Sequence, residues 1–202
     1  MKDKCIIALK RAEVVPEENA DYIGADRGAL VLADQGIRMV LAVGDFDSVT
    51  AEELERIKAY ADEVVVLNCI KDDSDSEHAV REAVSRGYAD IVLYGALGGR
   101  LDHEYVNLQL AVQFAGVLTL ADSRNRIKAY KKGSWRFPAG ESKYFSVFAC
   151  DPSCISLQGM KYALDHRELK PEDLYGLSNE ITGEEGILTV HEGTVLVFLS
   201  ED

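Results

Sequence analysis

Residues 40–48 have the sequence Val-Leu-Ala-Val-Gly-Asp-Phe-Asp-Ser, an apolar run that ends in a short acidic loop. The same order recurs twice. Residues 64–67 precede the Lys-Asp-Asp-Ser-Asp sequence of 71–75, and residues 91–94 precede the Gly-Ala-Leu-Gly-Gly-Arg-Leu-Asp sequence of 95–102. Short apolar runs between helical segments are typical of a parallel sheet covered on both faces. Because loops that follow neighbouring parallel strands share one crevice, these three loops predict a ligand site at the strand ends.

Strand and helix patterns alternate along the chain up to about residue 120. The expected strands are residues 5–9, 21–25, 39–43, 64–67, 91–94 and 117–120. The expected helices are residues 27–35, 50–61, 74–86 and 103–114. Two helices begin with the spacing of a capping box, at Thr50–Glu53 and Ser74–Glu77. This part of the chain predicts an α/β domain.

The helical period is lost beyond residues 121–126. Short apolar runs follow, separated by Gly, Pro, Asp and Asn, at residues 127–130, 143–149, 155–157, 186–190 and 194–199. This spacing predicts a small antiparallel sandwich or barrel. The last two runs, joined across residues 191–193, are expected to pair as a hairpin. We therefore expect two domains, residues 1–122 and 123–202.

Composition limits the classes of partner. The chain has 202 residues, 47% of them hydrophobic, and a formal net charge of −13. Such an acidic balance argues against binding a nucleic-acid backbone, although a metal can neutralise a nucleotide and its site. No apolar run approaches the ~20 residues of a membrane span, and no signal peptide fits the N-terminus. We expect a cytoplasmic protein with no nucleic-acid or membrane partner.

The first acidic loop favours metal chemistry over a simple turn. Asp45 and Asp47 flank Phe46, and alternate residues of an extended segment point the same way, so both carboxylates can face one ion. Gly44 permits an unusual backbone turn at this point. The competing interpretation is a turn in which Asp47 or the next serine caps the following helix. Thr50 already provides that cap, which favours a chemical role for the carboxylates.

The other two loops suit a metal and a phosphate. Three carboxylates within residues 72–75 exceed what a helix cap at Ser74 needs. Backbone N–H groups of the Gly98-Gly99 turn can hold phosphate oxygens, and Arg100 can grip a phosphate through two donors. The competing interpretation of the last loop is a glycine turn, an Asp102 cap and a surface arginine. Taken together, the loops predict a magnesium–nucleotide site.

Asp26 follows another expected strand. It either joins the same acidic rim or forms the N-cap of the helix that starts at Arg27.

These ordered motifs resemble the thiamine pyrophosphokinase family. Its Gly-Asp-Phe-Asp-Ser run matches residues 44–48, its Lys-Asp-x-Thr-Asp motif resembles residues 71–75, and its Gly-Gly-Arg-x-Asp-His motif matches residues 98–103. Weaker matches are Asp26–Gly28, Asn107, Gly159–Leu164 and Gly176–Glu180. The chain departs from the family at Leu9-Lys10-Arg11, where Gly-Gly is usual.

The resemblance implies a Rossmann-like catalytic domain followed by an antiparallel β-sandwich that binds thiamine. It implies a homodimer in which the two subunits share each active site. It also implies transfer of a diphosphoryl group from ATP to the hydroxyl of thiamine, with Mg²⁺, to give thiamine diphosphate and AMP.

The resemblance also implies roles for individual residues. The implied magnesium ligands, direct or through water, are Asp45, Asp47, Asp72 and Asp75. The implied nucleotide contacts are Asp26, Ser74, Gly98, Gly99 and Arg100, with Arg100 on the transferred diphosphate. Asp102 is expected to orient Arg100 or a metal-bound water, and either Asp47 or Asp75 to accept the hydroxyl proton. The implied substrate side consists of Asp45, Ser178, Asn179 and Tyr162, although a core position for Tyr162 is an equal alternative.

Two other functions compete. In an aspartyl-phosphate phosphatase, Asp45 would be the nucleophile and Asp47 the acid–base, but the Gly-Gly-Arg loop and the second half would have no role. In a non-catalytic nucleotide or thiamine sensor, the retained acidic ligands would have no purpose.

Overall fold

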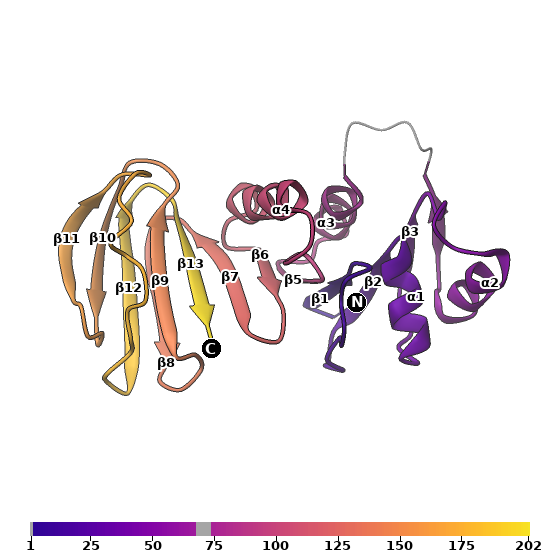
Figure 1. Ribbon diagram of the computed structural model, residues 1–202, viewed down its shortest axis with the longest axis horizontal. Helices are drawn as coiled ribbons and strands as arrows, with labels where there is room; N and C mark the ends of the chain where they lie inside the picture. Colours follow the sequence, from indigo (N-terminus) through magenta and orange to yellow (C-terminus); the bar gives the residue numbers. More distant parts are fainter. Residues whose placement is uncertain (1, 68–73) are drawn as a thin grey trace. The chain divides into compact units, whose positions relative to one another are not determined.

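The computed structural model describes residues 2–67 and 74–202 (Figure 1). The chain forms two compact units, one made of Met1–Asn107 with Leu120–Asp122 and the other of Leu108–Thr119 with Ser123–Asp202. The predicted fold class, a Rossmann-like α/β domain and an antiparallel β-sandwich, is confirmed. The chain passes more than once between the units, so the boundary at residue 123 stays a prediction.

The first unit is built on a parallel sheet. Its strands are β1 Lys4–Ala8, β2 Asp21–Ala25, β3 Leu41–Gly44, β4 Val64–Val66 and β5 Asp90–Tyr94. They lie in the order β4-β3-β2-β1-β5, and each pairing is parallel. Its helices are α1 Arg27–Asp34, α2 Ala51–Tyr60 and α3 Asp75–Ser85. Two elements are divided between the units, the helix α4 Leu101–Gln113 and the strand β6 Leu118–Ala121.

Alternate strand residues point to opposite faces of the sheet, so apolar strand residues can pack against the helices. Ile6 and Tyr22 belong to the apolar cluster that contains Leu32 of α1 and Ile57 of α2. Burying Ile57 completely stabilises the fold by about 2–3 kcal/mol. The α2 helix begins at the predicted complete capping box between Thr50 and Glu53. The α3 helix contacts β1, β2 and β3.

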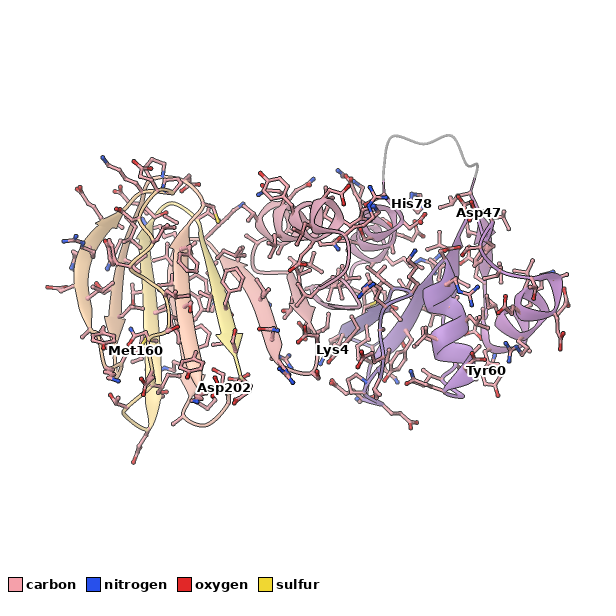
Figure 2. The ribbon with its side chains drawn as sticks, in the orientation of Figure 1. Lys4, Asp47, Tyr60, His78, Met160 and Asp202 are labelled. Carbon is pink, nitrogen blue, oxygen red and sulfur yellow. The ribbon has the colours of Figure 1, made fainter. Side chains whose placement is uncertain are left out.

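The parallel arrangement brings the carboxyl ends of the strands to one edge. Asp47 and His78 lie at that edge of the first unit, whereas Lys4, in the first strand, and Tyr60, at the end of α2, lie at the other (Figure 2). The loops after β1, β2, β3 and β5 therefore leave the sheet close together. None of the helices within the described residues is long and apolar enough to cross a membrane.

The second unit is a sandwich of two antiparallel sheets. Its strands are β7 Asn125–Tyr130, β8 Gly133–Pro138, β9 Tyr144–Ala149, β10 Ser153–Gln158, β11 Leu164–Leu169, β12 Glu185–Glu192 and β13 Val195–Ser200. One layer consists of β7-β13-β9, the last three strands of the nine-stranded sheet, and the other is a separate sheet with the order β11-β10-β12-β8. Phe137 of one sheet packs edge-on against Phe145 of the other, with ring centroids 5.0 Å apart. Burying Phe145 contributes up to about 3 kcal/mol.

The predicted hairpin across residues 191–193 is wrong. β12 pairs with β10 and β8, whereas β13 pairs with β7 and β9, so the turn carries the chain from one sheet to the other. The backbone N–H of Thr194 donates to Oδ1 of Asp151, and the N–H of Cys150 donates to the carbonyl of Thr194. These bonds tie the start of β13 to the β9–β10 turn instead of to β12.

Two strands, β8 and β11, are absent from the sequence prediction. The sequences Gly-Ser-Trp-Arg-Phe-Pro and Leu-Asp-His-Arg-Glu-Leu contain too few apolar residues to show a strand pattern. Both strands lie at the outer positions of their sheet, where only one neighbour must be satisfied.

Candidate active site

A cavity of about 430 Å³ lies at the carboxyl edge of the parallel sheet. Loops after β1, β2, β3 and β5 line it, together with the first residues of α3 and part of α4. The lining residues are Leu9, Lys10, Arg11, Ala25, Asp26, Asp45, Ser74, Asp75, Ser76, Gly95, Ala96, Gly98, Arg100, His103 and Asn107. All of them belong to the first unit.

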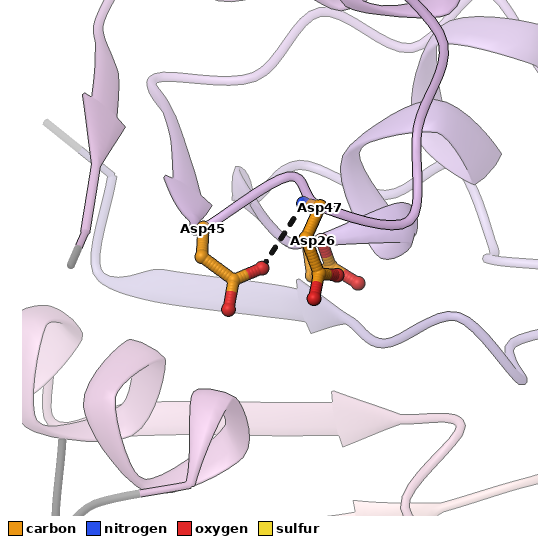
Figure 3. A group of neighbouring side chains, drawn as sticks. All are labelled: Asp26, Asp45 and Asp47. Atoms are coloured by element: carbon orange, nitrogen blue, oxygen red, sulfur yellow. Dashed lines mark hydrogen bonds between the residues drawn. The ribbon is translucent and has the colours of Figure 1, made fainter. Parts of the chain in front are cut away.

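Three carboxylates converge at this edge. One oxygen each from Asp26, Asp45 and Asp47 lies within 4.8 Å of the others (Figure 3). The group joins the loops after β2 and β3, which are neighbouring strands. Carboxylates this close repel one another unless a cation lies between them.

Asp26 has the strongest sign of an unmet partner. It stands at the N-cap position of α1 with φ 49° and ψ −124°, but its side chain makes no capping hydrogen bond. The Ser48 hydroxyl donates to Oδ2 at 2.9 Å, whereas Oδ1 is buried and has no hydrogen-bond partner among the described residues. The interpretation of Asp26 as a helix cap is therefore wrong. An unpartnered buried acceptor destabilises the fold by about 1–3 kcal/mol, which a bound cation would relieve.

The turn after β3 differs from the predicted one. Gly44 does not have a positive φ; the left-handed residue is Phe46, with φ 54°. Gly44 is needed for space instead, because a Cβ there would lie 2.9 Å from the backbone nitrogen and Cα of Asp26. The loop is a turn and not extended, and the Asp47 N–H donates to Oδ1 of Asp45 at 3.1 Å. The two carboxylates converge because of this turn and not because of strand alternation.

The negative charges of the group affect the pKa of Asp47. The neighbouring Asp45 carboxylate, followed by desolvation and the charge of Asp26, raises the pKa of Asp47 above its ordinary value. This is the direction that like charges impose.

The donor set fits a hard divalent cation. Oxygen ligands from several carboxylates are what Mg²⁺ prefers. Asp26, Asp45 and Asp47 supply such oxygens, and the buried Oδ1 of Asp26 lacks another partner among the described residues. Asp75 lines the same cavity. Asp72, with Lys71 and Asp73, lies outside the described residues, so its predicted role is not placed.

The Gly-Gly-Arg loop has the expected backbone freedom. Gly98 and Gly99 have φ of 74° and 89°, values that other residues rarely adopt. Arg100 donates to both carboxylate oxygens of Asp102, at 3.1 and 2.5 Å, as the proposed orienting role requires. The hydrogen bonds from Arg100 lower the pKa of Asp102 to about 2, so Asp102 is ionised at neutral pH.

A carboxylate already occupies one donor of this loop. The backbone N–H of Gly98 donates to Oε2 of Glu104 at 3.1 Å. The loop therefore accepts an anion in the way expected for a phosphate oxygen.

Polar side chains that line the cavity form a chain of hydrogen bonds in which sequence reasoning assigned a role to Ser74 alone. The hydroxyls of Ser74 and Ser76 are 3.0 Å apart, Ser76 donates to Oδ1 of Asn107 at 2.9 Å, and Nδ2 of Asn107 donates to the carbonyl of Ala96 at 2.8 Å. Ser74 also caps α3 by accepting from the N–H of Glu77. This chain fixes the start of α3 to α4 and to the loop after β5. Asn107 was visible in the sequence as a motif residue, whereas Ser76 carried no signal.

The structure places the predicted sandwich residues on two loops, with Tyr162 between β10 and β11 and with Ser178 and Asn179 between β11 and β12. Ser178 is exposed with φ 57°, and its N–H donates to Oγ of Ser146. Tyr162 is 60% exposed, so the core alternative for this tyrosine is wrong. Asn179 is buried, and its side chain bonds to both backbone groups of Tyr162, to the N–H of Glu180 and to Sδ of Met160. With all its donors and acceptors used, Asn179 positions Ser178 and Tyr162, and a direct contact with thiamine stays a prediction.

Comparison with known proteins agrees with this division. The family model for the thiamin pyrophosphokinase catalytic domain matches residues 15–120, and that for the thiamin pyrophosphokinase vitamin B1 binding domain matches residues 125–195. The thiamine pyrophosphokinase of Bacillus subtilis (strain 168) is 32% identical to this chain over 216 residues, and the alignment covers 100% of each protein.

Solved structures show the same fold over the whole chain. A thiamin pyrophosphokinase family protein from Enterococcus faecalis has a TM-score of 0.88 at 30% identity, with 98% of this chain and 99% of that one covered. The Bacillus subtilis thiamine pyrophosphokinase has a TM-score of 0.87 at 29% identity, with the same coverage. The chain therefore belongs to the thiamin pyrophosphokinase family, whose members are diphosphotransferases.

Proposed function

We propose that this enzyme transfers a diphosphoryl group from Mg-ATP to the hydroxyl of thiamine, giving thiamine diphosphate and AMP. The observation that carries the proposal is that Asp26 and Asp45, which converge with Asp47, line the same cavity as Gly98 and Arg100. The first group suits a metal and the second a polyphosphate. We also propose a cytoplasmic location for the enzyme.

Asp26, Asp45 and Asp47 would hold the magnesium, with Asp75 and Asp72 as the further acidic residues of the site. The bound ion would neutralise phosphate charge and align the reacting groups. The convergence of the three aspartates and the unpartnered Oδ1 of Asp26 support this role.

The chain's own residues would hold the group that moves. Arg100, held by Asp102, would bind the transferred diphosphate, and the N–H groups of the Gly98-Gly99 turn would bind its oxygens once Glu104 releases Gly98. These contacts stabilise the charge of the transition state in place, which supplies most of the rate in phosphoryl transfer. The thiamine hydroxyl would lose its proton to Asp47 or Asp75.

Thiamine would bind at the exposed sandwich residues Ser178 and Tyr162, whose two loops are linked by the hydrogen bonds of Asn179. Each complete site would combine the catalytic unit of one subunit with the sandwich of its partner, in a homodimer. The family match of residues 125–195 to a vitamin B1 binding domain supports the assignment of thiamine to the sandwich.

The test is release of AMP from Mg-ATP, followed with and without thiamine. We expect AMP and thiamine diphosphate in equal amounts, only when thiamine and Mg²⁺ are both present. Inorganic phosphate release with a phosphorylated Asp45 would instead support the phosphatase alternative. Tight binding of both ligands without AMP would support the sensor.

A further inference from the structure

The loop after β1 brings cations to the nucleotide cavity where the family usually has Gly-Gly. Lys10 and Arg11 both line the cavity. The Leu9 N–H donates to the carbonyl of Tyr94, the last residue of β5, at 2.9 Å, and the Ala12 N–H donates to the carbonyl of Leu9 at 3.0 Å. This tight turn fixes the loop after β1 against the loop after β5.

The contact between the two loops is close. A Cβ at Gly95 would lie 2.5 Å from the backbone nitrogen of Ala12. Arg11 is therefore held by backbone packing at the side of the Gly-Gly-Arg loop.

The Arg11 guanidinium packs directly over Gly99. A Cβ at Gly99 would lie 2.8 Å from Cζ and 2.9 Å from Nη1 of Arg11, and a Cβ at Gly98 would lie 3.7 Å from Nη2. The two glycines thus form a flat platform on which the guanidinium rests. Larger residues at either position would push it away.

Arg11 differs from Arg100 in its partners. Arg100 is bound by Asp102 through two hydrogen bonds. Arg11 makes no hydrogen bond or ion pair within residues 2–67 and 74–202, although Asp26, Asp45 and Asp75 line the same cavity. Its five N–H donors are available to a ligand in the cavity.

We propose that Arg11 is a second phosphate-binding residue of this enzyme, which holds the polyphosphate of the Mg-nucleotide beside Gly98 and Gly99. The proposal rests on the proposed function, in which Mg-ATP occupies this cavity. A planar guanidinium matches two phosphate oxygens at once, and a chain with a net charge of −13 needs local cations to hold a polyanion. Lys10 adds a second positive charge to the same wall.

The test compares Arg11→Gln with a matched variant, Arg38→Gln. Arg38 is exposed and pairs with Asp62, away from the cavity lining, so its loss changes net charge equally. We expect Arg11→Gln to weaken calorimetric binding of Mg-ATP and of Mg-pyrophosphate about tenfold, with AMP binding nearly unchanged. Arg38→Gln should leave all three affinities unchanged. Equal affinities in wild type and Arg11→Gln, or equal losses in both variants, would overturn the proposal.

One further variant tests the geometry of the contact. Arg11→Lys keeps the charge but not the two-pronged contact, so we expect a loss of Mg-pyrophosphate affinity smaller than that of Arg11→Gln. A loss in Arg11→Lys as large as in Arg11→Gln would show that the guanidinium geometry, and not the charge alone, is required.

The outcome separates this inference from the proposed function. If wild type makes AMP with thiamine and Arg11→Gln binds Mg-pyrophosphate normally, Arg11 has no such role and the function stands. If Mg-pyrophosphate binding depends on Arg11 but AMP never forms, the phosphate site stands and the proposed reaction falls.

Discussion

At the residue scale, Asp26 gives the strongest indication that the group of Asp26, Asp45 and Asp47 is a ligand site. A carboxylate at a helix N-cap normally accepts hydrogen bonds from the helix, and this one does not. Its left-handed φ and its unpartnered Oδ1 are unfavourable unless a ligand compensates them. Such local instability is a common property of functional sites.

Replacing Asp26 with Asn should therefore weaken metal binding and activity without destabilising the protein. We expect about tenfold weaker Mg²⁺ binding and about a hundredfold lower kcat/KM. In EDTA the variant should be as stable as wild type or more so, because repulsion from Asp45 and Asp47 is reduced.

Thermal unfolding with and without Mg²⁺ gives a readout besides activity, since wild type should gain more stability from the ion than the variant. Asp34→Asn, at an exposed residue that pairs with Arg56, is the matched control. An equal Mg²⁺-induced shift in wild type and Asp26→Asn would rule out Asp26 as a ligand.

The buried thiol of Cys5 predicts how the stability of the fold depends on pH. Burial raises its thiol pKa from 9.0 to about 12. Because the folded pKa is the higher one, its contribution to stability is complete below pH 9 and is lost as the pH rises through 9 towards 12. Between pH 8 and pH 10 this amounts to about 1.4 kcal/mol.

Cys5→Ala should remove that share of the pH dependence. Urea unfolding of both proteins at pH 8 and pH 10 measures it. Identical losses in wild type and variant would show that this thiol does not titrate with unfolding.

At the scale of elements, the loop of residues 176–180 is held by one amide. Asn179 links Tyr162, Glu180 and Met160, and its backbone pairs with Phe145 of β9. It therefore connects the loop expected to bind thiamine to the sandwich core.

Asn179→Ala should destabilise the sandwich by about 3 kcal/mol, because it leaves two partly buried backbone groups of Tyr162 without partners. It should also raise KM for thiamine while leaving the affinity for Mg-ATP unchanged. Ser178→Ala removes an exposed hydroxyl and should change stability by less than about 1 kcal/mol. If Asn179→Ala alters neither unfolding nor the KM for thiamine, the positioning role is wrong.

At the scale of the whole molecule, the shared site between subunits can be tested with two inactive variants. Asp47→Asn disables the catalytic unit, and Ser178→Arg places a cation where cationic thiamine would bind. In a mixed dimer with shared sites, one site combines two intact halves, so co-expression should restore about a quarter of wild-type activity.

If each site lay within one subunit, both variants would stay inactive after mixing. Cutting the chain near residue 123 is a related test, and neither half alone should form AMP. An active N-terminal half would overturn the shared site.

Local pattern was enough for much of the fold. The helices from Arg27, Ala51 and Asp75 begin within one residue of their expected starts, because caps and glycine stops act on near neighbours. The predicted hairpin was wrong because the pairing of β13 depends on residues that are distant in the sequence. Which sheet β13 joins depends on Asp151 and Cys150, about forty residues earlier in the chain.

By itself, the sequence determined the fold class, the family and the three loops that carry the chemistry, because apolar periodicity and motif order are local properties of the chain. Only the tertiary structure shows that Asp26 lies beside Asp45 and Asp47, that the side-chain amide of Asn179 donates to the carbonyl of Tyr162, and that Arg11 packs over Gly99. Each of these depends on which strands lie side by side. The strand order β4-β3-β2-β1-β5 brings distant loops to one edge, and nothing in a single loop records its neighbours.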